Sequence, residues 1–339
     1  MTSEKVVRRG VWILLLMVCA VRTAFPQIQT SQAQASQAQP SQSVDLFKAE
    51  ETKLYGDAHP YLDEPLPKLK KAVHELGGLK PDFNQQPLPD ILAKVGGKAD
   101  ELLRKVPDLI SDEEVSETQS TVVQETTPGC SGADCERFHK GESAQRNQKF
   151  SYMILTHPAQ NGLLLLEEYR TDRKDRPVAE RAAAPHFQGF ASAWLVFSSL
   201  NQVESRYRYL GQQQTDGHNT FVIAFAQIPG SIRSPGQFLS PKGSVPMLLQ
   251  GIAWIDQSDF RVVRLRTDLL EPQPQVDFQK QTSNMVFGPV HIEGIDSELW
   301  LPRNVNVEME ANGQYLQEEH EYSKYRLYQA KTKIILSPN

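Results

Sequence analysis

A strict alternation of apolar and polar residues near the C-terminal end constrains the fold most strongly. Val305, Val307 and Met309 alternate with polar residues, and the dipeptide Asn312-Gly313 follows closely. A period of two is typical of a strand with one buried face, and Asn and Gly tolerate the positive φ that a tight hairpin turn needs. The segment 247–328 is therefore predicted to form a ladder of antiparallel strands with one apolar face.

The same strand pattern begins near residue 148. Asp216-Gly217 lies between two apolar stretches and predicts another tight hairpin. We expect about nine or ten strands, which mostly pair as neighbouring hairpins in a strongly curved antiparallel sheet. The expected strands before the final hairpin span residues 150–156, 163–171, 206–213, 220–227, 248–256, 260–268, 276–287 and 290–300.

Two segments between these strands have a different pattern. In the apolar stretch 189–200, Phe190, Trp194 and Phe197 recur about one helical turn apart, which predicts a helix. The stretch 228–245 is rich in Pro, Gly and Ser and predicts a long loop. Long loops in compact domains are often functional or mobile.

The segment 44–125 has apolar residues at helical spacing and predicts a small helical domain. One helix ends at Gly77-Gly78 and a second ends at Gly96-Gly97, because paired glycines are typical helix stops. A third is ended by Pro107, and the capping box from Ser111 to Glu114 predicts the start of a fourth. The pattern leaves open whether this domain packs on the sheet or stands apart.

The N-terminus predicts export. Lys5, Arg8 and Arg9 precede an apolar run that ends at Ala20 and is too short for a comfortable membrane span. Residues 1–20 are therefore interpreted as a signal peptide, and the mature chain as a periplasmic protein without a transmembrane span. Lipidation at Cys19 and a retained N-terminal anchor are the alternatives. Residues 21–43 form a Gln/Ala/Ser-rich stretch that predicts a disordered linker.

The net charge argues against two classes of partner. Removal of residues 1–20, which carry a net charge of +2, takes the formal charge from −5 to −7. Nucleic-acid binding and electrostatic membrane binding both depend on clustered positive charge, and the mature chain has no basic stripe. We expect neither a nucleic-acid partner nor a basic membrane-binding patch.

Two cysteines lie in a short connection between the helical and strand-rich parts, residues 126–147. Cys130 and Cys135 are the only cysteines of the mature chain if cleavage falls after Ala20. In an exported protein a close pair of this kind predicts a disulfide. His139 completes a spacing that hints at zinc, but zinc requires a fourth ligand and reduced thiols, so no metal site is predicted.

No motif predicts catalysis. The eight histidines are scattered, none belongs to a His-Glu-x-x-His motif, and His320 lies in an acidic stretch that we expect to be exposed. Ser192 is one residue away from the spacing of a nucleophile elbow. Adjacent carboxylates such as Glu318 and Glu319 point to opposite faces of a strand. We therefore predict that the protein is not an enzyme and needs no cofactor.

Two predicted strands are apolar on both faces, so something must cover each side. The first interpretation is that the 189–200 helix covers one face and the N-terminal helices cover the other. The second is that one face lines a cavity for an apolar ligand. Large apolar side chains are the candidates for such a cavity: Trp194, Phe197, Phe221, Phe225, Trp254 and Trp300.

The second half of the chain resembles a known family. From 251 to 328 it carries G-I-A-W-I-D, F-R-V-V-R-L-R, F-G-P-V, L-W-L-P and E-Y-S-K-Y-R-L-Y in the order of strands found in the outer-membrane lipoprotein-sorting, LolA/LolB-like superfamily. The resemblance covers about 149–333. The layout of the whole chain also resembles an exported bacterial family without an established activity.

This resemblance implies an α+β fold in which an unclosed antiparallel half-barrel, residues 148–333, curves around a helix and is followed by a short tail, 334–339. It also implies an apolar cavity for acyl chains or an apolar protein segment. The extra helical domain, the 228–245 loop and the linker depart from the lipoprotein carriers.

The function expected from these observations is non-enzymatic binding of a lipid or other apolar ligand in the periplasm. The alternative is an interaction module of the cell envelope whose own helix fills the cavity and whose helical domain docks a protein partner. A hydrolase with a site assembled from scattered residues is the third hypothesis.

Overall fold

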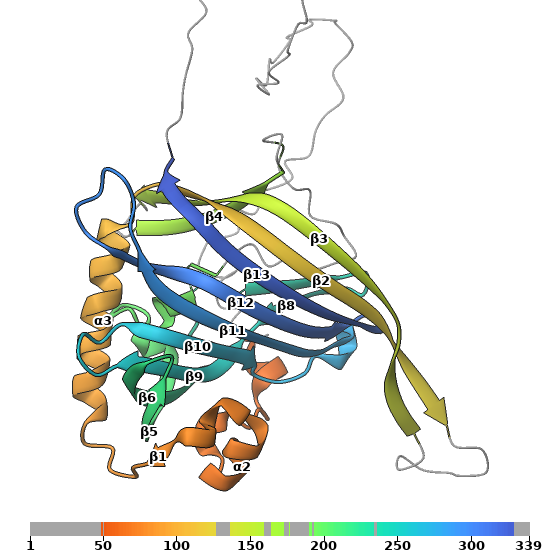
Figure 1. Ribbon diagram of the computed structural model, residues 1–339. Coiled ribbons are helices and arrows are strands. Elements are labelled where there is room, and N and C mark those ends of the chain that lie inside the picture. The colour runs from red at the N-terminus through yellow and green to blue at the C-terminus, as the bar shows by residue number, and fades with distance from the viewer. Residues whose placement is uncertain are drawn as a thin grey trace, which may run out of the picture. The chain divides into compact units, whose positions relative to one another are not determined.

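Eleven strands of the described chain form one curved antiparallel sheet (Figure 1). The computed structural model describes residues 49, 51–126, 136–158, 164–172, 176, 190–191, 193–233 and 236–328. All of them lie in the compact unit Ser41–Asn339. The order of strands is β1-β5-β6-β9-β10-β11-β12-β13-β2-β3-β4, so the sheet is unclosed and has β1 and β4 at its edges.

Two further strands, β7 and β8, pair only with each other. The strands have the following bounds: β1 Lys80–Pro81, β2 Leu109–Thr126, β3 Glu136–Pro158, β4 Leu164–Thr171, β5 Ser205–Thr215, β6 His218–Gln227, β7 Gly236–Ser240, β8 Gly243–Met247, β9 Leu249–Asp256, β10 Val262–Leu269, β11 Phe278–Val290, β12 Leu299–Ala311 and β13 Gln314–Leu327.

The two hairpins with the strongest turn signals form as predicted. Asn312 and Gly313 connect β12 to β13 with φ values of 52° and 67°. Asp216 and Gly217 connect β5 to β6 with φ values of 51° and 84°. Both turns use the left-handed region that these residue types tolerate. The predicted class, an α+β fold with a curved, unclosed antiparallel sheet, is confirmed.

The N-terminal strand β2 was not expected. The sequence predicted a fourth helix at Ser111, and this prediction is wrong, because Ser111 and Glu113 lie in β2 with side chains buried on one face of the sheet. The strand pairs with β13 from Gln314 opposite Thr121 to Leu327 opposite Leu109. The predicted junction loop 126–147 is likewise shorter, since β3 already begins at Glu136.

The longest helix is α3, and it is continuous through the glycine pair that was expected to stop it. The helices have the following bounds: η1 Tyr61–Asp63, α2 Leu66–Ala72, η2 His74–Gly78, α3 Leu88–Lys105, η4 Ala193–Phe197, η5 Gln202–Glu204 and η6 Pro274–Val276. A Cβ on Gly96 would meet the Phe197 carbonyl oxygen at 3.1 Å. Gly96 therefore permits close packing of α3 on η4 and does not end the helix.

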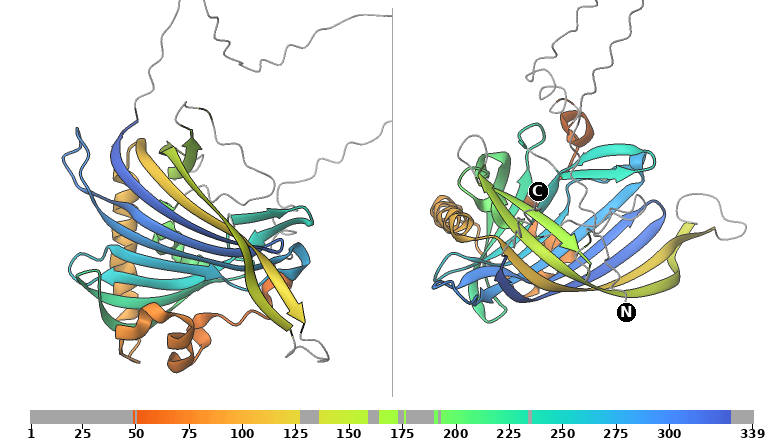
Figure 2. Two further views of the ribbon diagram at one scale, coloured as in Figure 1. Left: turned by 45° about the vertical axis from the view of Figure 1, so that its right-hand side comes forward. Right: turned by 90° about the horizontal axis from the view of Figure 1, so that it is seen from above.

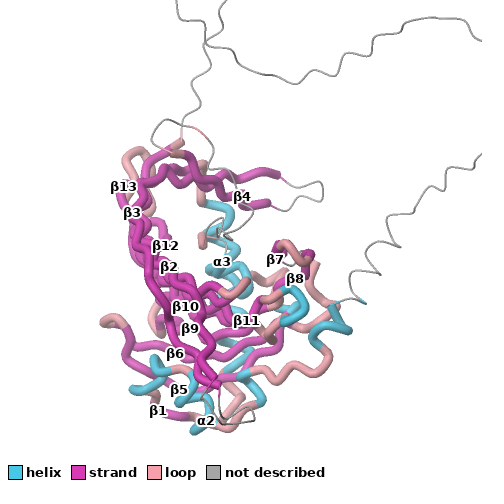
Figure 3. Tube along the Cα trace, turned by 90° about the vertical axis from the view of Figure 1, so that its right-hand side faces the viewer, coloured by secondary structure: helices cyan, strands magenta, loops and turns pink. Residues whose placement is uncertain are grey.

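The segment 189–200, expected to be a helix, contains only the single 3-10 turn η4 in its described part. The helix on the inner side of the curved sheet is α3 (Figure 3). It packs together with η4 on one face of the strands, in a core that contains Ile223 and Phe225 of β6. Curvature around a helix is therefore observed, but that helix comes from the N-terminal part.

The opposite face of the sheet is covered by the chain between Tyr55 and Leu79. Val222 and Ala224 of β6 pack there with Val73 and Leu76, and all four side chains are fully buried. Because Val222 and Ile223 are neighbours in one strand, the two cores lie on opposite faces of the sheet. The N-terminal helices thus do not form a separate layer: α3 covers one face, and α2, η1 and η2 cover the other.

The stretch 228–245, predicted to be a long loop, contains most of the β7–β8 hairpin. The Phe238 ring of β7 stacks on the Phe278 ring of β11 with centroids 4.0 Å apart. This contact belongs to a third, smaller apolar cluster that includes Val245 and Leu269. The hairpin therefore covers part of the main sheet.

One edge of β3 is only partly paired. Strand β4 pairs with β3 from Ser151 to Pro158, and the remainder of β3 pairs with β2 alone. Figures 1 and 2 show this part of the β2–β3 hairpin reaching beyond the neighbouring strands. Its exposed side chains include Arg146 and Lys149, and charged residues on a free edge disfavour unwanted strand addition.

Several predictions concern residues outside the described part of the chain. These are the signal peptide 1–20, the linker 21–43, the Cys130–Cys135 disulfide and the tail 334–339. Among the described residues, no helix combines the length and apolar character that a membrane crossing requires.

The two helix glycines should respond oppositely to alanine. Gly97→Ala should raise the free energy of unfolding by up to about 1 kcal/mol, because its Cβ meets nothing within 4 Å and alanine favours helix. In Gly96→Ala the new Cβ would lie 2.6 Å from Gln202 Nε2, which donates to the Leu92 and Phe197 carbonyl oxygens. Loss of those bonds should lower the free energy of unfolding by about 1 kcal/mol.

Urea denaturation of both variants beside the wild type measures the difference. Equal stabilisation by the two substitutions would contradict the close packing of α3 on η4.

Candidate functional site

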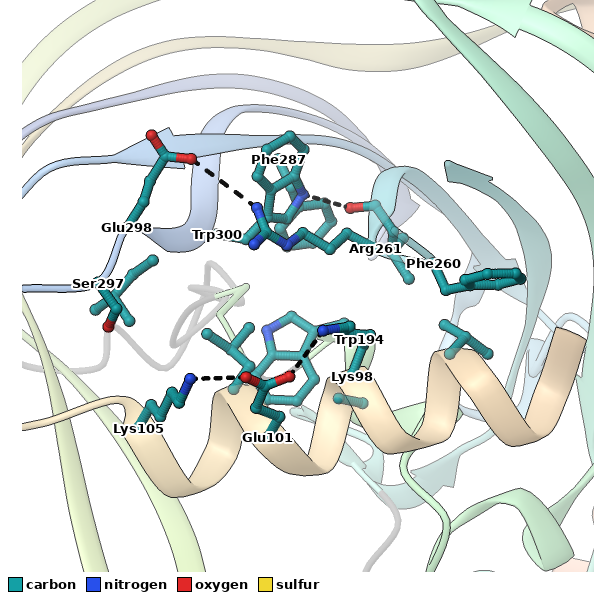
Figure 4. A pocket seen from close by; sticks show the side chains of 15 residues that line it. Lys98, Glu101, Lys105, Trp194, Phe260, Arg261, Phe287, Ser297, Glu298 and Trp300 are labelled. Atoms are coloured by element: carbon teal, nitrogen blue, oxygen red, sulfur yellow. Dashed lines mark hydrogen bonds and ion pairs between the residues drawn. The ribbon is translucent and has the colours of Figure 1, made fainter. Parts of the chain in front are cut away.

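A pocket of about 190 Å³ lies between α3 and one end of the sheet (Figure 4). On the sheet side it is bounded by the β9–β10 turn, by β11 and by the start of β12. Fifteen residues line it: Val95, Lys98, Ala99, Glu101, Leu102, Lys105, Trp194, Phe260, Arg261, Val262, Phe287, Ser297, Glu298, Leu299 and Trp300.

The walls of the pocket are mostly apolar. Val95, Ala99 and Leu102 follow one another at helical spacing and present one face of α3 to the pocket. Trp194 comes from η4, and Phe287 faces them from β11. An apolar hollow with a few polar groups is the usual form of a small-molecule site.

Charged side chains line the two facing sides of the pocket. On α3, the Glu101 carboxylate accepts hydrogen bonds from Lys98 Nζ at 2.9 Å and Lys105 Nζ at 2.7 Å. The bond from Lys105, followed by that from Lys98, lowers the pKa of Glu101 to about 2. Across the pocket, Arg261 lies 3.9 Å from a Glu298 carboxylate oxygen (Figure 4).

The two tryptophans of the pocket differ in their hydrogen bonding. Trp300 Nε1 donates to the Val262 carbonyl oxygen at 2.8 Å, and the Arg261 guanidinium lies 5.3 Å from the Trp300 ring. Trp194 Nε1 is buried and has no hydrogen-bond partner among the described residues. The side chain of Trp194 as a whole is only 4% exposed.

A second cluster of chemically active groups is buried on the same face of the sheet. Arg170 donates to Glu113 from Nε at 2.5 Å and from Nη2 at 2.7 Å. The Tyr322 hydroxyl donates to the same carboxylate at 2.8 Å. His320 places Nδ1 3.0 Å from Glu113 Oε1 and Nε2 3.1 Å from Glu318 Oε2. We call these five residues the buried ion network.

The charges of this network balance, with two carboxylates facing one guanidinium and one imidazolium. Burial alone would raise the pKa of Glu113, but Arg170 and His320 overcome it and lower that pKa to about 2. Burial alone would lower the pKa of His320, but its hydrogen bonds to Glu113 and Glu318 raise it. These contacts therefore favour the charged form of both groups, and both imidazole nitrogens are occupied.

The prediction that His320 is exposed is wrong, because its side chain is 1% exposed. Strand alternation places it on the face of β13 that also carries Leu316 and Tyr322, both buried. That periodicity was the available signal, and the surrounding acidic residues obscured it. Among the described residues, no group of three His, Cys, Asp or Glu side chains is arranged to hold a metal ion.

The predicted cavity residues fall into three groups. Trp194 and Trp300 line the pocket. Phe197, Phe221 and Phe225 belong to the core on the same face, where the Phe197 and Phe225 rings meet edge to face at 5.8 Å. Trp254 does not line the pocket: it is fully buried on the opposite face, and its Nε1 donates to Gln213 Oε1 at 3.2 Å.

Several pocket residues were not predicted. Ala99 and Leu102 were assigned to a helical domain whose packing on the sheet was left open, and Phe260, Arg261 and Glu298 lie in or beside turns. The sequence indicates exposure or helix periodicity at these positions. It does not indicate how close these segments lie in the folded chain. The folded chain brings them together because α3 crosses the end of the sheet.

No protein-family model matches the chain, and no curated protein sequence matches it. Several solved structures are similar, among them the following three. An outer membrane lipoprotein-sorting protein domain from Vibrio parahaemolyticus has 12% identity and a TM-score of 0.35, over 71% of this chain and 94% of that chain. A DUF1329 family protein from Desulfovibrio piger has 11% identity and a TM-score of 0.35, over 73% and 95%.

The third is the MucA/MucB complex from Pseudomonas aeruginosa, with 10% identity and a TM-score of 0.19 over 71% of this chain and all of that chain. At these identities and TM-scores the likeness concerns the fold alone.

The buried ion network should make stability depend on pH in two windows. Because the pKa of His320 is raised on folding, its contribution is complete below about pH 6.5 and is lost as the pH rises through the folded value. Because the pKa of Glu113 is lowered from 4.5 to about 2, its contribution is complete above about pH 4.5 and is lost as the pH falls toward 2.

His320→Gln should lower the free energy of unfolding by about 3 kcal/mol at pH 6, because it leaves the buried Glu318 without the imidazolium and Glu113 with Arg170 alone. The penalty should shrink at high pH, where the wild-type imidazole is neutral. Urea denaturation from pH 5 to 10 measures both effects, with His291→Gln at an exposed position as the matched control. Parallel pH profiles for wild type and His320→Gln would contradict a charged His320.

Proposed function

We propose that the protein is an exported, non-enzymatic binding protein that holds the apolar part of a ligand in the pocket between α3 and the sheet. The observation that carries this proposal is the pocket itself: apolar walls from α3, η4 and β11, with charged groups on both facing sides. Burial of apolar surface supplies the binding free energy, and the charged groups favour a ligand with a polar end.

The size of the pocket limits what it takes up. An apolar cavity of about 150 Å³ is large enough for benzene. The pocket of about 190 Å³ suits a group of similar size and is too small to enclose a whole lipid. A longer ligand would therefore place one end in the pocket and extend from it.

Export is proposed from the N-terminal sequence, in which Lys5, Arg8 and Arg9 precede a short apolar run. The absence of catalysis is proposed from the hydrogen bonds that hold the titratable side chains. His320 has carboxylates on both ring nitrogens, and the Glu101 carboxylate is shared by two lysines. Groups held in this way are poorly suited to accept or release protons near neutral pH.

Filling the pocket tests the proposal. Ala99→Phe places a large side chain in the pocket, because Ala99 is buried and lines it. Ala93→Phe puts the same side chain on an exposed position of the same helix and is the matched control. The measurement is mass spectrometry of organic extracts from proteins purified from a bacterial periplasm without detergent. We expect a stoichiometric small molecule in the wild type and in Ala93→Phe, reduced at least about tenfold in Ala99→Phe.

Circular dichroism of the same samples shows whether Ala99→Phe folds. If folded Ala99→Phe retains as much ligand as Ala93→Phe, the ligand lies elsewhere. An empty extract from folded wild type would contradict the proposal.

A second candidate function is docking of an envelope protein, as the sequence analysis also considered. The observation that favours it is the part of β3 before Ser151, which pairs on one side only among the strands that the structure describes. Chemical cross-linking in the periplasm would test it, with a partner linked through Lys149 as the expected result. A cross-linked partner together with an empty extract would favour this candidate.

A further inference from the structure

The turn that carries Trp194 is joined to the buried ion network by direct contacts. The Phe190 ring meets the His320 ring edge to face, with centroids 5.3 Å apart. The backbone N–H of Ala191 donates to a Glu168 carboxylate oxygen at 3.2 Å. Phe190, which touches the network, and Trp194, which lines the pocket, are only four positions apart in the chain.

Glu168 is itself connected to the network through two tyrosines. Its carboxylate accepts a hydrogen bond from the Tyr152 hydroxyl, which also lies 3.4 Å from the Ala191 nitrogen. The Tyr152 ring lies 5.0 Å from the ring of Tyr322, a member of the network. Both side chains that hold Ala191 therefore belong to the same polar interior as the network.

The contacts continue from Phe190 to the wall of the pocket. The Ala193 N–H donates to the Phe190 carbonyl oxygen at 3.2 Å and starts η4. On its other side η4 packs closely on α3 at Gly96, and the Trp194 ring lies beside α3 in the pocket (Figure 4). A shift of Phe190 is therefore passed on to Trp194, because a close-packed interior leaves little room to absorb it.

The proton on His320 balances the charges of the network. His320 faces Glu113 of β2, Arg170 of β4, and Glu318 and Tyr322 of β13. The described part of the segment 190–197 brings no charged side chain. Loss of the imidazole proton to solvent leaves one buried negative charge without a cation. Such a charge is costly, so the network must rearrange or admit water.

We propose that the buried ion network positions Trp194 through Phe190, so that the affinity of the pocket for an apolar ligand depends on the protonation of His320. This inference rests on the proposed function and adds a regulation of the same pocket. The protonated form keeps the wall in place and binds, and deprotonation releases the ligand. His320 and Phe190 are positioning residues, because neither lines the pocket.

Toluene binding as a function of pH tests the coupling, since toluene is uncharged throughout. Isothermal titration calorimetry of the full mature chain, freed of ligand, gives the dissociation constant of toluene. We expect it to rise about tenfold between about pH 6 and about pH 10 in the wild type, which is typical of coupled sites. Coupling is reciprocal, so titrations in two buffers of different ionisation enthalpy should show proton uptake from solvent on binding near the midpoint of the rise.

Phe190→Leu separates positioning from a structural role. It leaves every network residue in place, so the pH profile of stability should remain that of the wild type. It removes the ring that links His320 to Trp194, so the rise in the dissociation constant should shrink to about twofold or less. Phe197→Leu is the matched control and should keep the full rise, because the Phe197 ring meets Phe225 in the apolar core.

A dissociation constant that does not change with pH in the wild type would overturn the coupling. An unchanged rise in Phe190→Leu would also overturn it. His218 is the alternative source of a pH effect, because its ring lies 6.0 Å from the ring of Trp300, which lines the pocket. The rise should persist in His218→Gln, and its loss there would assign the effect to Trp300 and overturn the proposal.

The proposed function fails separately. Toluene binding that is equal at every pH, and that Ala99→Phe abolishes, would uphold the pocket and overturn the coupling. Absence of toluene binding at every pH would overturn the coupling, and together with an empty wild-type extract it would overturn both.

Discussion

The fold depends on a sheet that is apolar on both faces. From Phe221 to Ala226 in β6 and from Ile252 to Ile255 in β9, alternate residues belong to the two cores, so neither face can be left to water. One continuous N-terminal segment covers both: Tyr55 to Leu79 packs on one face, and α3 crosses the other. The pocket exists because α3 does not pack fully against the end of the sheet. The β9–β10 turn leaves a gap there beside Trp194.

The inner face combines two kinds of interior. Near β2, β4 and β13 the buried ion network satisfies its charges internally and holds these three strands in one register. Near α3 the interior is apolar and incompletely filled. A satisfied network is rigid, because each partner that moves leaves a charge unpaired in low dielectric. The two regions therefore suit different tasks, specification of the fold in one and accommodation of a guest in the other.

Local patterns in the sequence predicted most of the sheet, and tertiary contacts account for the errors. Asn312-Gly313 and the alternation around Val305 require no distant partner, so that hairpin was predictable. Gly96 was predicted to end a helix. In the folded chain the Phe197 carbonyl oxygen lies too close for a side chain at this position, and the sequence does not reveal that distance. His320 appeared exposed because its buried carboxylate partner Glu113 is distant in sequence. Of the pocket, Trp194 and Trp300 were predicted, and the α3 residues opposite them were not.

The position of β13 has a consequence for how the molecule is made. The last strand of the chain lies inside the sheet, between β12 and β2, and pairs Leu327 with Leu109. Contacts between such distant parts form late, since the loop between them must close first. A chain that is still being synthesised therefore exposes unpaired edges on β2 and β12 until β13 is available. Completion of the sheet must await β13, and a chain that stalls before it is left open to proteases and to aggregation.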